Sequence, residues 1–306
     1  KFLFSSNHTN WRTSKLAIPF KVGDKIEVTM DRLAAGGAGV SRHEGVVVFV
    51  PLTAPGDRVI ARVTFIKKNF AEAELVKVLT AGPSRIEPLC PVFGECGGCN
   101  WQHISYEEQL LQKRNIIEFG VKRLEPSALV QPVIPSPEEW RYRHRIQIHI
   151  DEGKLGFLRR RSHKIVDIQD CPITEGSVVN QFGKLRTKYA NAEPTRLEIG
   201  LRENGEFYKI DLQKEDYSFS QANRYLNKQL VQTALDFLAR FSPTSLLDLY
   251  CGEGNFTFAA ADRFPKMPIS GVEFSANAVE VAKKRSLAYG DRVQFFQGDV
   301  AHFLAD

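Results

Sequence analysis

The chain has 306 residues, of which 43% are hydrophobic and 25% are charged, and its formal net charge is +5. This composition is typical of a globular protein, and the length allows two or three domains. Five cysteines are too few for a small disulfide-stapled scaffold, and neither a secretory segment nor an apolar run long enough to cross a membrane is evident. We therefore expect a cytoplasmic protein with no membrane partner.

After an N-terminal tail of residues 1–20, residues 21–82 are rich in Val and Ile, with Gly-Asp, Gly-Gly and Pro-Gly breaks. This pattern predicts strands over residues 25–30, 45–51, 58–66 and 71–79, which an OB-like barrel would bury. The glycine loop at residues 34–39 lacks the Lys-Ser or Lys-Thr of a phosphate loop, so a wide turn is expected. The runs at 21–24, 36–40, 48–51 and 55–57 resemble a TRAM domain, an OB-like RNA-binding module of RNA-modifying enzymes.

Four cysteines mark a central domain, expected over residues 83–215. Cys90, Cys96 and Cys99 have the spacing C-x5-C-x2-C, and Cys171 follows after 71 intervening residues. Thiolates select zinc or iron-sulfur clusters, and zinc sites tend to consist of two short-spaced pairs. The three-plus-one pattern therefore favours a [4Fe-4S] cluster, with zinc or free thiols as the alternatives.

A helix is predicted next, over residues 105–124. Ser105 to Glu108 form a candidate capping box, and the apolar residues have the spacing of one packed helix face. This stripe consists of Leu110, Ile117, Val121 and Leu124.

The basic charge is concentrated between Arg141 and Lys164. This segment contains eight Lys or Arg residues and only two acidic residues, Asp151 and Glu152. Its local charge is therefore +6, against +5 for the whole chain. Alternation from residue 141 to 150, followed by a turn, predicts a hairpin. It would present Arg141, Arg143, Arg145, Arg159, Arg160 and Arg161. We interpret this surface as a phosphate-contacting RNA site; a solvated sheet face is the alternative.

From residue 216 to 306 the pattern becomes α/β, with a buried strand leading into a glycine turn. Asp248, Gly252 and Gly254 give the D-x-x-x-G-x-G arrangement of class I methyltransferases, and Thr257 replaces the third glycine of a dinucleotide fingerprint. Glu273 ends the second strand, where it could accept the ribose hydroxyls of S-adenosylmethionine. Asp299 follows the third strand, where it could meet the adenine amino group.

Taken from residue 21 onward, the chain resembles the bacterial RNA (uracil-5-)-methyltransferases, in particular the iron-sulfur-containing 23S rRNA enzymes. The specific parts are the cysteine spacing, the CGGCNWQH run at 96–103, FSQAN at 219–223 and DLYCGEGNFT at 248–257. The resemblance implies cluster ligation by the four cysteines and S-adenosylmethionine contacts from Gln221, Tyr250, Asn255, Glu273 and Asp299. It also implies that the helix at 105–124 packs with the methyltransferase domain.

In that family, a thiolate adds to C6 of uracil so that C5 becomes nucleophilic enough to take a methyl group. A base then removes the C5 proton, and the thiolate leaves. The family's nucleophilic Cys and proton-abstracting Glu follow the third strand, so we expect both beyond Asp306 and predict that this chain is a monomeric, incomplete and inactive piece. Cys251, in the cofactor turn, is interpreted as a packing residue and not as a substitute nucleophile.

Two further interpretations stay open. One is a non-catalytic iron-sulfur RNA-binding protein, and the other is a methyltransferase acting on another atom, such as cytosine C5. The sequence does not distinguish ribosomal from transfer RNA.

Overall fold

The computed structural model describes residues 18–202, 204–214 and 220–305. The chain separates into two compact units. The first comprises Lys1–Pro88 and Asn100–Pro132, and the second comprises Leu89–Cys99 and Val133–Asp306. Among the described residues, no helix is both long and apolar enough to span a membrane.

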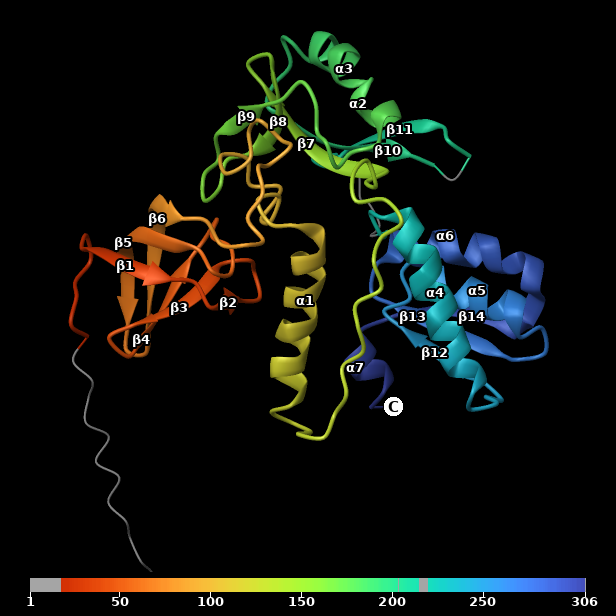
Figure 1. Cartoon of the computed structure of the whole chain (residues 1–306). Coiled ribbons are helices and arrows are strands. Elements are labelled where there is room, and N and C mark those ends of the chain that lie inside the picture. The colour runs from red at the N-terminus through yellow and green to blue at the C-terminus, as the bar shows by residue number, and fades with distance from the viewer. Residues whose placement is uncertain (1–17, 203, 215–219, 306) are drawn as a thin grey trace, which may run out of the picture. The chain divides into compact units, whose positions relative to one another are not determined.

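The first unit contains a six-stranded sheet in the order β1-β5-β6-β4-β3-β2 (Figure 1). Its strands are β1 (Lys25–Thr29), β2 (Arg32–Leu33), β3 (Gly39–His43), β4 (Val46–Val50), β5 (Arg58–Lys67) and β6 (Phe70–Thr80). Alternate side chains are buried along β4 and β5, because successive residues of a strand point to opposite faces. The four expected strands are therefore present, while β2 and β3, on either side of the glycine loop, were not predicted.

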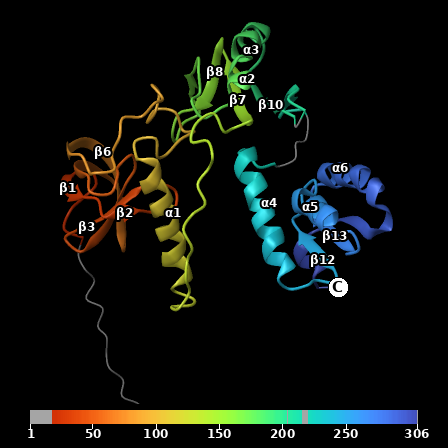
Figure 2. The same ribbon diagram turned by 45° about the vertical axis from the view of Figure 1, so that its right-hand side comes forward.

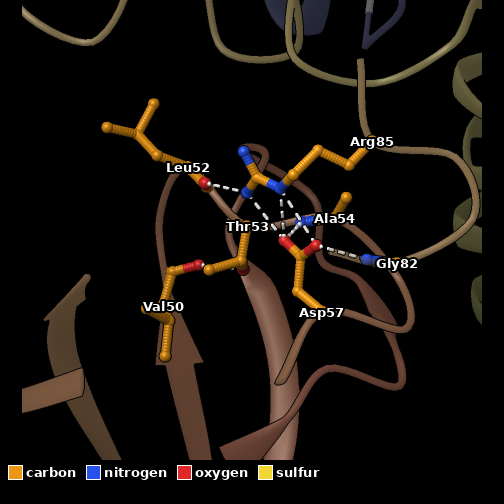
Figure 3. Close-up of polar contacts among 7 residues, drawn as sticks. All are labelled: Val50, Leu52, Thr53, Ala54, Asp57, Gly82 and Arg85. Carbon is orange, nitrogen blue, oxygen red and sulfur yellow. Dashed lines mark hydrogen bonds and ion pairs between the residues drawn. The ribbon is translucent and has the colours of Figure 1, made fainter. Parts of the chain in front are cut away.

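A buried ion pair fixes the loop between β4 and β5 to the chain that leaves β6 (Figure 3). Arg85 donates from Nη2 to Asp57 at 2.7 Å, and the Asp57 side chain is fully buried. Asp57 also accepts hydrogen bonds from the backbone nitrogens of Ala54 and Gly82. Burial alone would raise the pKa of Asp57, but the bonds from Arg85 and the two backbone groups outweigh it and hold the pKa below its usual value.

Helix α1 (Tyr106–Val121) belongs to the same unit as this sheet. Its one buried residue, Gln112, contacts β2 through Oε1, which accepts a hydrogen bond of 2.9 Å from the Leu33 nitrogen. The expected packing of the apolar stripe is wrong at Ile117 and Leu124, which are 56% and 90% exposed. The side chain of Ser105 makes no capping bond either, so that expected capping box does not form.

The second unit begins with an antiparallel sheet in the order β11-β10-β7-β8-β9. Its strands are β7 (Arg145–Asp151), β8 (Lys154–Leu158), β9 (Ile165–Asp167), β10 (Thr195–Leu201) and β11 (Phe207–Asp211), and its helices are α2 (Gly176–Val179) and α3 (Phe182–Lys188). β7 and β8 form the expected hairpin, with His149 opposite Gly156. Ile146, Ile148 and Ile150 point into the core, as the alternation predicted.

The second unit ends in a parallel sheet in the order β12-β13-β14, with its helices around it (Figures 1 and 2). The elements are α4 (Arg224–Ala239), β12 (Leu246–Leu249), α5 (Asn255–Arg263), β13 (Ile269–Glu273), α6 (Ala276–Ser286), the 3-10 helix η1 (Leu287–Arg292), β14 (Val293–Gln297) and α7 (Val300–Phe303). Leu235 of α4, Phe258 of α5 and Val279 of α6 share one core cluster with Ile269 and Phe295. This is the α/β arrangement that the sequence predicted.

Candidate S-adenosylmethionine site

The turn between β12 and α5 has an unusual backbone. Tyr250, Gly252 and Gly254 all have positive φ, at 58°, 56° and 89°. A Cβ on Gly254 would lie 2.6 Å from the Phe258 ring, so glycine is required there for packing as well as for conformation. A Cβ on Gly252 would meet no described atom within 4 Å. The backbone of Gly252 is therefore open to close approach by a ligand.

Two of the predicted acidic residues converge on this turn. Asp248, in β12, accepts a bond of 2.6 Å from the hydroxyl of buried Thr257, and burial raises the pKa of Asp248 despite that bond. Glu273, at the end of β13, accepts from the backbone nitrogen of Gly252 at 3.1 Å and from that of Ser275 at 2.8 Å. Both carboxylates act electrostatically on the Cys251 thiol, so they lie near one another at the same edge of the sheet.

Asp299 follows β14, the neighbour of β13, and is exposed. Its Oδ1 accepts hydrogen bonds from the backbone nitrogens of Ala301 and His302, which caps α7. Because both bonds use Oδ1, Oδ2 is directed elsewhere. A carboxylate thus lies at or near the carboxyl end of each of the parallel strands β12, β13 and β14, which is the arrangement expected for a nucleotide-like ligand.

Asn255 and Gln221 belong to the starts of two helices: Asn255 begins α5, and Gln221 shortly precedes α4. Asn255 is the first residue of α5 and pairs with Asn227 of α4 through two hydrogen bonds, each 2.9 Å long. Gln221 is exposed in the segment that leads into α4. Phe219 of the FSQAN run lies outside the described residues.

Cys251 lies in the turn but is 6% exposed and belongs to the core cluster of the parallel sheet. Burial raises the pKa of Cys251 to about 12, and the nearby Asp248 and Glu273 contribute to the rise. A thiol with a raised pKa is mostly protonated at neutral pH, and the protonated form is a poor nucleophile. These observations support the packing role.

The other four cysteines gather in the antiparallel-sheet region. Cys96 and Cys171 are buried in one core cluster, and Cys99 packs against it. Burial raises the pKa of Cys96, and Cys99, Cys171 and Cys90 each raise it further, so these three thiols lie within electrostatic range of Cys96. Within the described ranges, no three or more His, Cys, Asp or Glu side chains are arranged to hold a metal ion.

The loop carrying the first three cysteines runs along the end of β8. The Gly97 nitrogen donates to the Leu158 carbonyl at 2.9 Å, and a Cβ on Gly97 would lie 2.8 Å from that oxygen. The Gly98 nitrogen donates to Cys96 Sγ at 3.4 Å. Gly97 therefore permits a close approach that a larger residue would block, whereas a Cβ on Gly98 would make only ordinary contacts.

Several of the predicted RNA-binding arginines hold these cysteine segments. Arg141 forms a two-bonded ion pair with Asp170 at 2.7 Å and donates to the carbonyls of Cys171 and Thr174. Arg160 donates to the carbonyl of Cys99 at 2.9 Å. These side chains lie beside the thiols and leave only part of their guanidinium groups for other partners.

The remaining arginines differ in exposure. Arg159 pairs with Glu95 at 3.0 Å while 53% of its side chain is exposed, and Arg161 is exposed as well. Arg143 is half-buried and bonds through its backbone nitrogen to Ile173. Arg145 has only 10% of its side chain exposed and pairs with the buried Glu198 at 2.8 Å. The regular alternation assumed for residues 141–144 fails because β7 begins only at Arg145.

Three residues with clear roles were not identified from the sequence. Thr257 supports Asp248, Glu198 pairs with Arg145, and Asn227 pairs with Asn255. Glu198 lies inside an apolar strand, and a lone carboxylate among buried neighbours is a usable signal because it requires a partner. Asn227 carries no such signal, since an Asn on a helix surface is common.

Comparison with known proteins agrees with this architecture. A model of the TRAM domain matches residues 19–76, and a model described as a methyltransferase domain matches residues 241–306. An uncharacterised RNA methyltransferase of Bdellovibrio bacteriovorus is 42% identical, over 98% of this chain and 77% of its own length. A 23S rRNA (uracil(1939)-C(5))-methyltransferase of Shewanella amazonensis is 30% identical, over 93% of this chain and 78% of its own length.

One solved structure is similar over most of the chain. It is the Pyrococcus abyssi tRNA (uracil-54, C5)-methyltransferase in complex with S-adenosyl-L-homocysteine, with a TM-score of 0.68 and 21% identity. The similarity covers 90% of this chain and 80% of that one. At this identity the match establishes the fold.

Proposed function

The chain belongs to the RNA (uracil-5-)-methyltransferase family, and on that premise we propose that it serves the transfer of a methyl group from S-adenosyl-L-methionine to C5 of a uridine in RNA. The observation that carries the proposal is the row of carboxylates, Asp248, Glu273 and Asp299, around a glycine turn with open backbone. The TRAM domain supplies a module for RNA at the other end of the sequence.

S-adenosyl-L-methionine supplies an electrophilic methyl group on a sulfonium sulfur. The chain's own residues bind and orient it. We propose that Asp248 accepts from the methionine ammonium group, Glu273 from the ribose hydroxyls and Asp299 from the adenine amino group. Gln221, Tyr250, Gly252, Gly254 and Asn255 complete the proposed contact set.

The nucleophile of the reaction is not among the cysteines of this chain as we assign them. Cys251 is a buried thiol with a raised pKa, and the other four are grouped in the antiparallel-sheet region. The prediction that the catalytic Cys and Glu lie beyond Asp306 therefore stays a prediction. It is checked by substituting the family's motif cysteine in the full-length protein.

For the four cysteines we propose ligation of a [4Fe-4S] cluster. Two observations support this proposal: the thiols of Cys90, Cys99 and Cys171 lie within electrostatic range of Cys96, and a backbone N–H already donates to one sulfur. In the part of the chain that the structure describes, the side chains themselves are not arranged to hold a metal ion. A cationic metal centre would offset the mutual repulsion of four thiolates, which otherwise opposes their burial. The cluster would connect the loop at Cys90 to Cys99 with the segment at Cys171, which supports a structural role. Zinc is the competing occupant.

Ribosomal RNA is the proposed substrate, because relatives of comparable coverage are named as 23S rRNA uracil-C5 methyltransferases. Transfer RNA is the alternative, since the similar solved structure is a tRNA enzyme. We propose phosphate contacts from Arg141, Arg143, Arg159, Arg160 and Arg161, while the buried pairing of Arg145 removes it from that set. A monomer acting in the cytoplasm completes the proposal.

The direct experiment incubates the full-length protein with S-adenosylmethionine carrying a labelled methyl group and with unmodified 23S rRNA or tRNA transcripts. Nucleoside analysis should show labelled 5-methyluridine from the 23S transcript. Label in 5-methyluridine from tRNA alone would reassign the substrate. Binding of RNA without any methyl transfer would support a non-catalytic RNA-binding protein instead.

A further inference from the structure

The segment that carries Gln221 is held against β7 on both sides of that residue. Arg145 Nη1 donates to Ser220 Oγ at 2.7 Å. His144 lies next to Ala222, with its backbone nitrogen 3.2 Å and its Nδ1 2.9 Å from the Ala222 carbonyl. Gln221, between these two attachments, has little backbone freedom while its side chain is exposed.

Arg145 can act as a fixed anchor because it is itself immobilised. Its Nη2 donates to Glu198 at 2.8 Å, and the Tyr208 hydroxyl donates to the other oxygen of Glu198 at 3.1 Å. Burial raises the pKa of Tyr208 to about 12, so the phenol keeps its proton and remains a donor at neutral pH. Each oxygen of the buried carboxylate thus has a hydrogen-bond donor, and Nη1 of Arg145 is left to bond Ser220.

The same segment starts α4. Asn223 caps the helix by accepting from the Leu226 nitrogen at 3.0 Å, and its amide nitrogen donates to Ser136 Oγ at 3.0 Å. One turn later on α4, Asn227 pairs with Asn255 by two reciprocal amide bonds of 2.9 Å. The start of α4 is therefore fixed to the antiparallel sheet at one end and to the first residue of α5 at the other.

We propose that Arg145 and Asn227 are positioning residues for the S-adenosylmethionine site, Arg145 acting through Ser220 on Gln221 and Asn227 acting directly on Asn255. This inference rests on the proposed function, since it takes Gln221 and Asn255 as cofactor contacts. The two attachments restrict the backbone at Gln221 and the side chain of Asn255 before the ligand arrives, which lowers the entropic cost of binding.

A purely structural role of the Asn pair makes a different prediction. The pair lies on the surface, where an amide hydrogen bond adds little to folding. If Asn227 only supported α4, its removal would change thermal stability slightly and ligand affinity not at all. If it orients Asn255, the effect appears in ligand affinity and depends on the presence of Asn255.

The test is a double-mutant cycle on the full-length protein, with the dissociation constant for S-adenosylmethionine measured by calorimetry. Asn227→Ala should weaken binding about two- to tenfold, and the double variant with Asn255→Ala should bind no more weakly than Asn255→Ala alone. Gln232→Ala is the matched control: it removes a surface amide of the same helix, one that bonds to Asp236, and should leave affinity unchanged.

The positioning role of Arg145 is tested with Ser220→Ala. Replacing Arg145 itself would leave Glu198 buried without its cation. Ser220→Ala should weaken binding in the presence of Gln221 and have no effect in a Gln221→Ala background. The inference would be overturned if Asn227→Ala and Ser220→Ala both left the affinity unchanged. It would also be overturned if their effects simply added to those of Asn255→Ala and Gln221→Ala. Failure of the wild-type protein to bind S-adenosylmethionine would instead overturn the proposed function.

Discussion

Thr257 donates a hydrogen bond of 2.6 Å to Asp248, although the two residues belong to different elements, α5 and β12. Thr257 is fully buried, so the bond is shielded from water. The position is the one at which a dinucleotide fingerprint would place its third glycine. Here the residue has a different task, which is to stabilise the charged form of a carboxylate that burial disfavours.

Thr257→Val should therefore raise the pKa of Asp248 further, because it removes the side-chain bond that favours the ionised form. Ionised Asp248 is the form that accepts from an ammonium group, so S-adenosylmethionine affinity should fall about tenfold. As the pH falls, the variant should also begin to lose affinity for S-adenosylmethionine at a higher pH than the wild type does. Calorimetric titrations across a pH series measure both effects. Thr257→Ser keeps the hydroxyl and should behave as wild type; an unchanged pH profile in the valine variant would contradict the account.

The buried pair of Asp57 and Arg85 should dominate the stability of the TRAM domain. Arg85→Met leaves Asp57 buried without its cation, at a cost of about 3–5 kcal/mol in the free energy of unfolding. Because the pKa of Asp57 is lowered in the folded state, the pair stabilises the protein above the ordinary pKa of Asp and loses this effect as pH falls through the lowered value.

Thermal unfolding should show that the stability difference between the wild type and Arg85→Met is smaller at acid pH than at neutral pH. The matched control is Arg58→Met, which breaks a pair with Glu27 whose side chains are 54% and 49% exposed. It should cost less than about 1 kcal/mol. Equal effects of the two substitutions would mean that the burial of Asp57 has no energetic consequence.

The proposed metal centre should depend on four of the five cysteines. Anaerobically prepared protein is expected to be brown and to contain iron and sulfide, and Cys96→Ala or Cys171→Ala should abolish both. Cys251→Ala should keep the iron, since Cys251 lies in the separate core of the parallel sheet. Metal analysis together with the visible spectrum gives the answer. A colourless protein with stoichiometric zinc would replace the cluster by a zinc site.

Exposed arginines near the cysteine loop should contribute to RNA affinity through phosphates. Replacing Arg159 and Arg161 together by Ala should weaken binding for all RNA sequences and lower the salt slope by about 1 for each phosphate that is no longer neutralised. Lys283→Ala, at an exposed position of α6, is the control and should leave the slope unchanged. An unaltered slope in the double variant would indicate that this surface is only solvated.

The elements that sequence predicts best here are those with a strong period or a strong break. Four strands of the TRAM domain, the β7–β8 hairpin and the three parallel strands were predicted because their patterning is regular. The short strands β2 and β3 were missed because the glycines between them suggest only a turn. The stripe on α1 was misjudged at Ile117, since periodic apolar residues indicate a helix without indicating what covers it.

The acids and glycines of the candidate site were apparent from the sequence, but the residues that support them were not. Asp248 and Glu273 follow from strand ends and spacing, which sequence displays directly. The bonds from Thr257 and Asn227 join residues of different elements, and only the folded arrangement brings those pairs together. Arg145 shows the same limit, because a positive charge on a strand does not reveal that the arginine forms an ion pair with the buried Glu198.

The most direct measurement of the central claim is tritium release from RNA that carries [5-³H]uridine. Methylation at C5 must displace the C5 hydrogen, whereas methylation of an oxygen or a nitrogen leaves it in place. With the full-length protein and unmodified 23S rRNA, we predict tritium release that requires S-adenosylmethionine and matches the methyl groups transferred. Methyl transfer without tritium release, or no transfer at all, would contradict the assignment as a uracil-C5 methyltransferase.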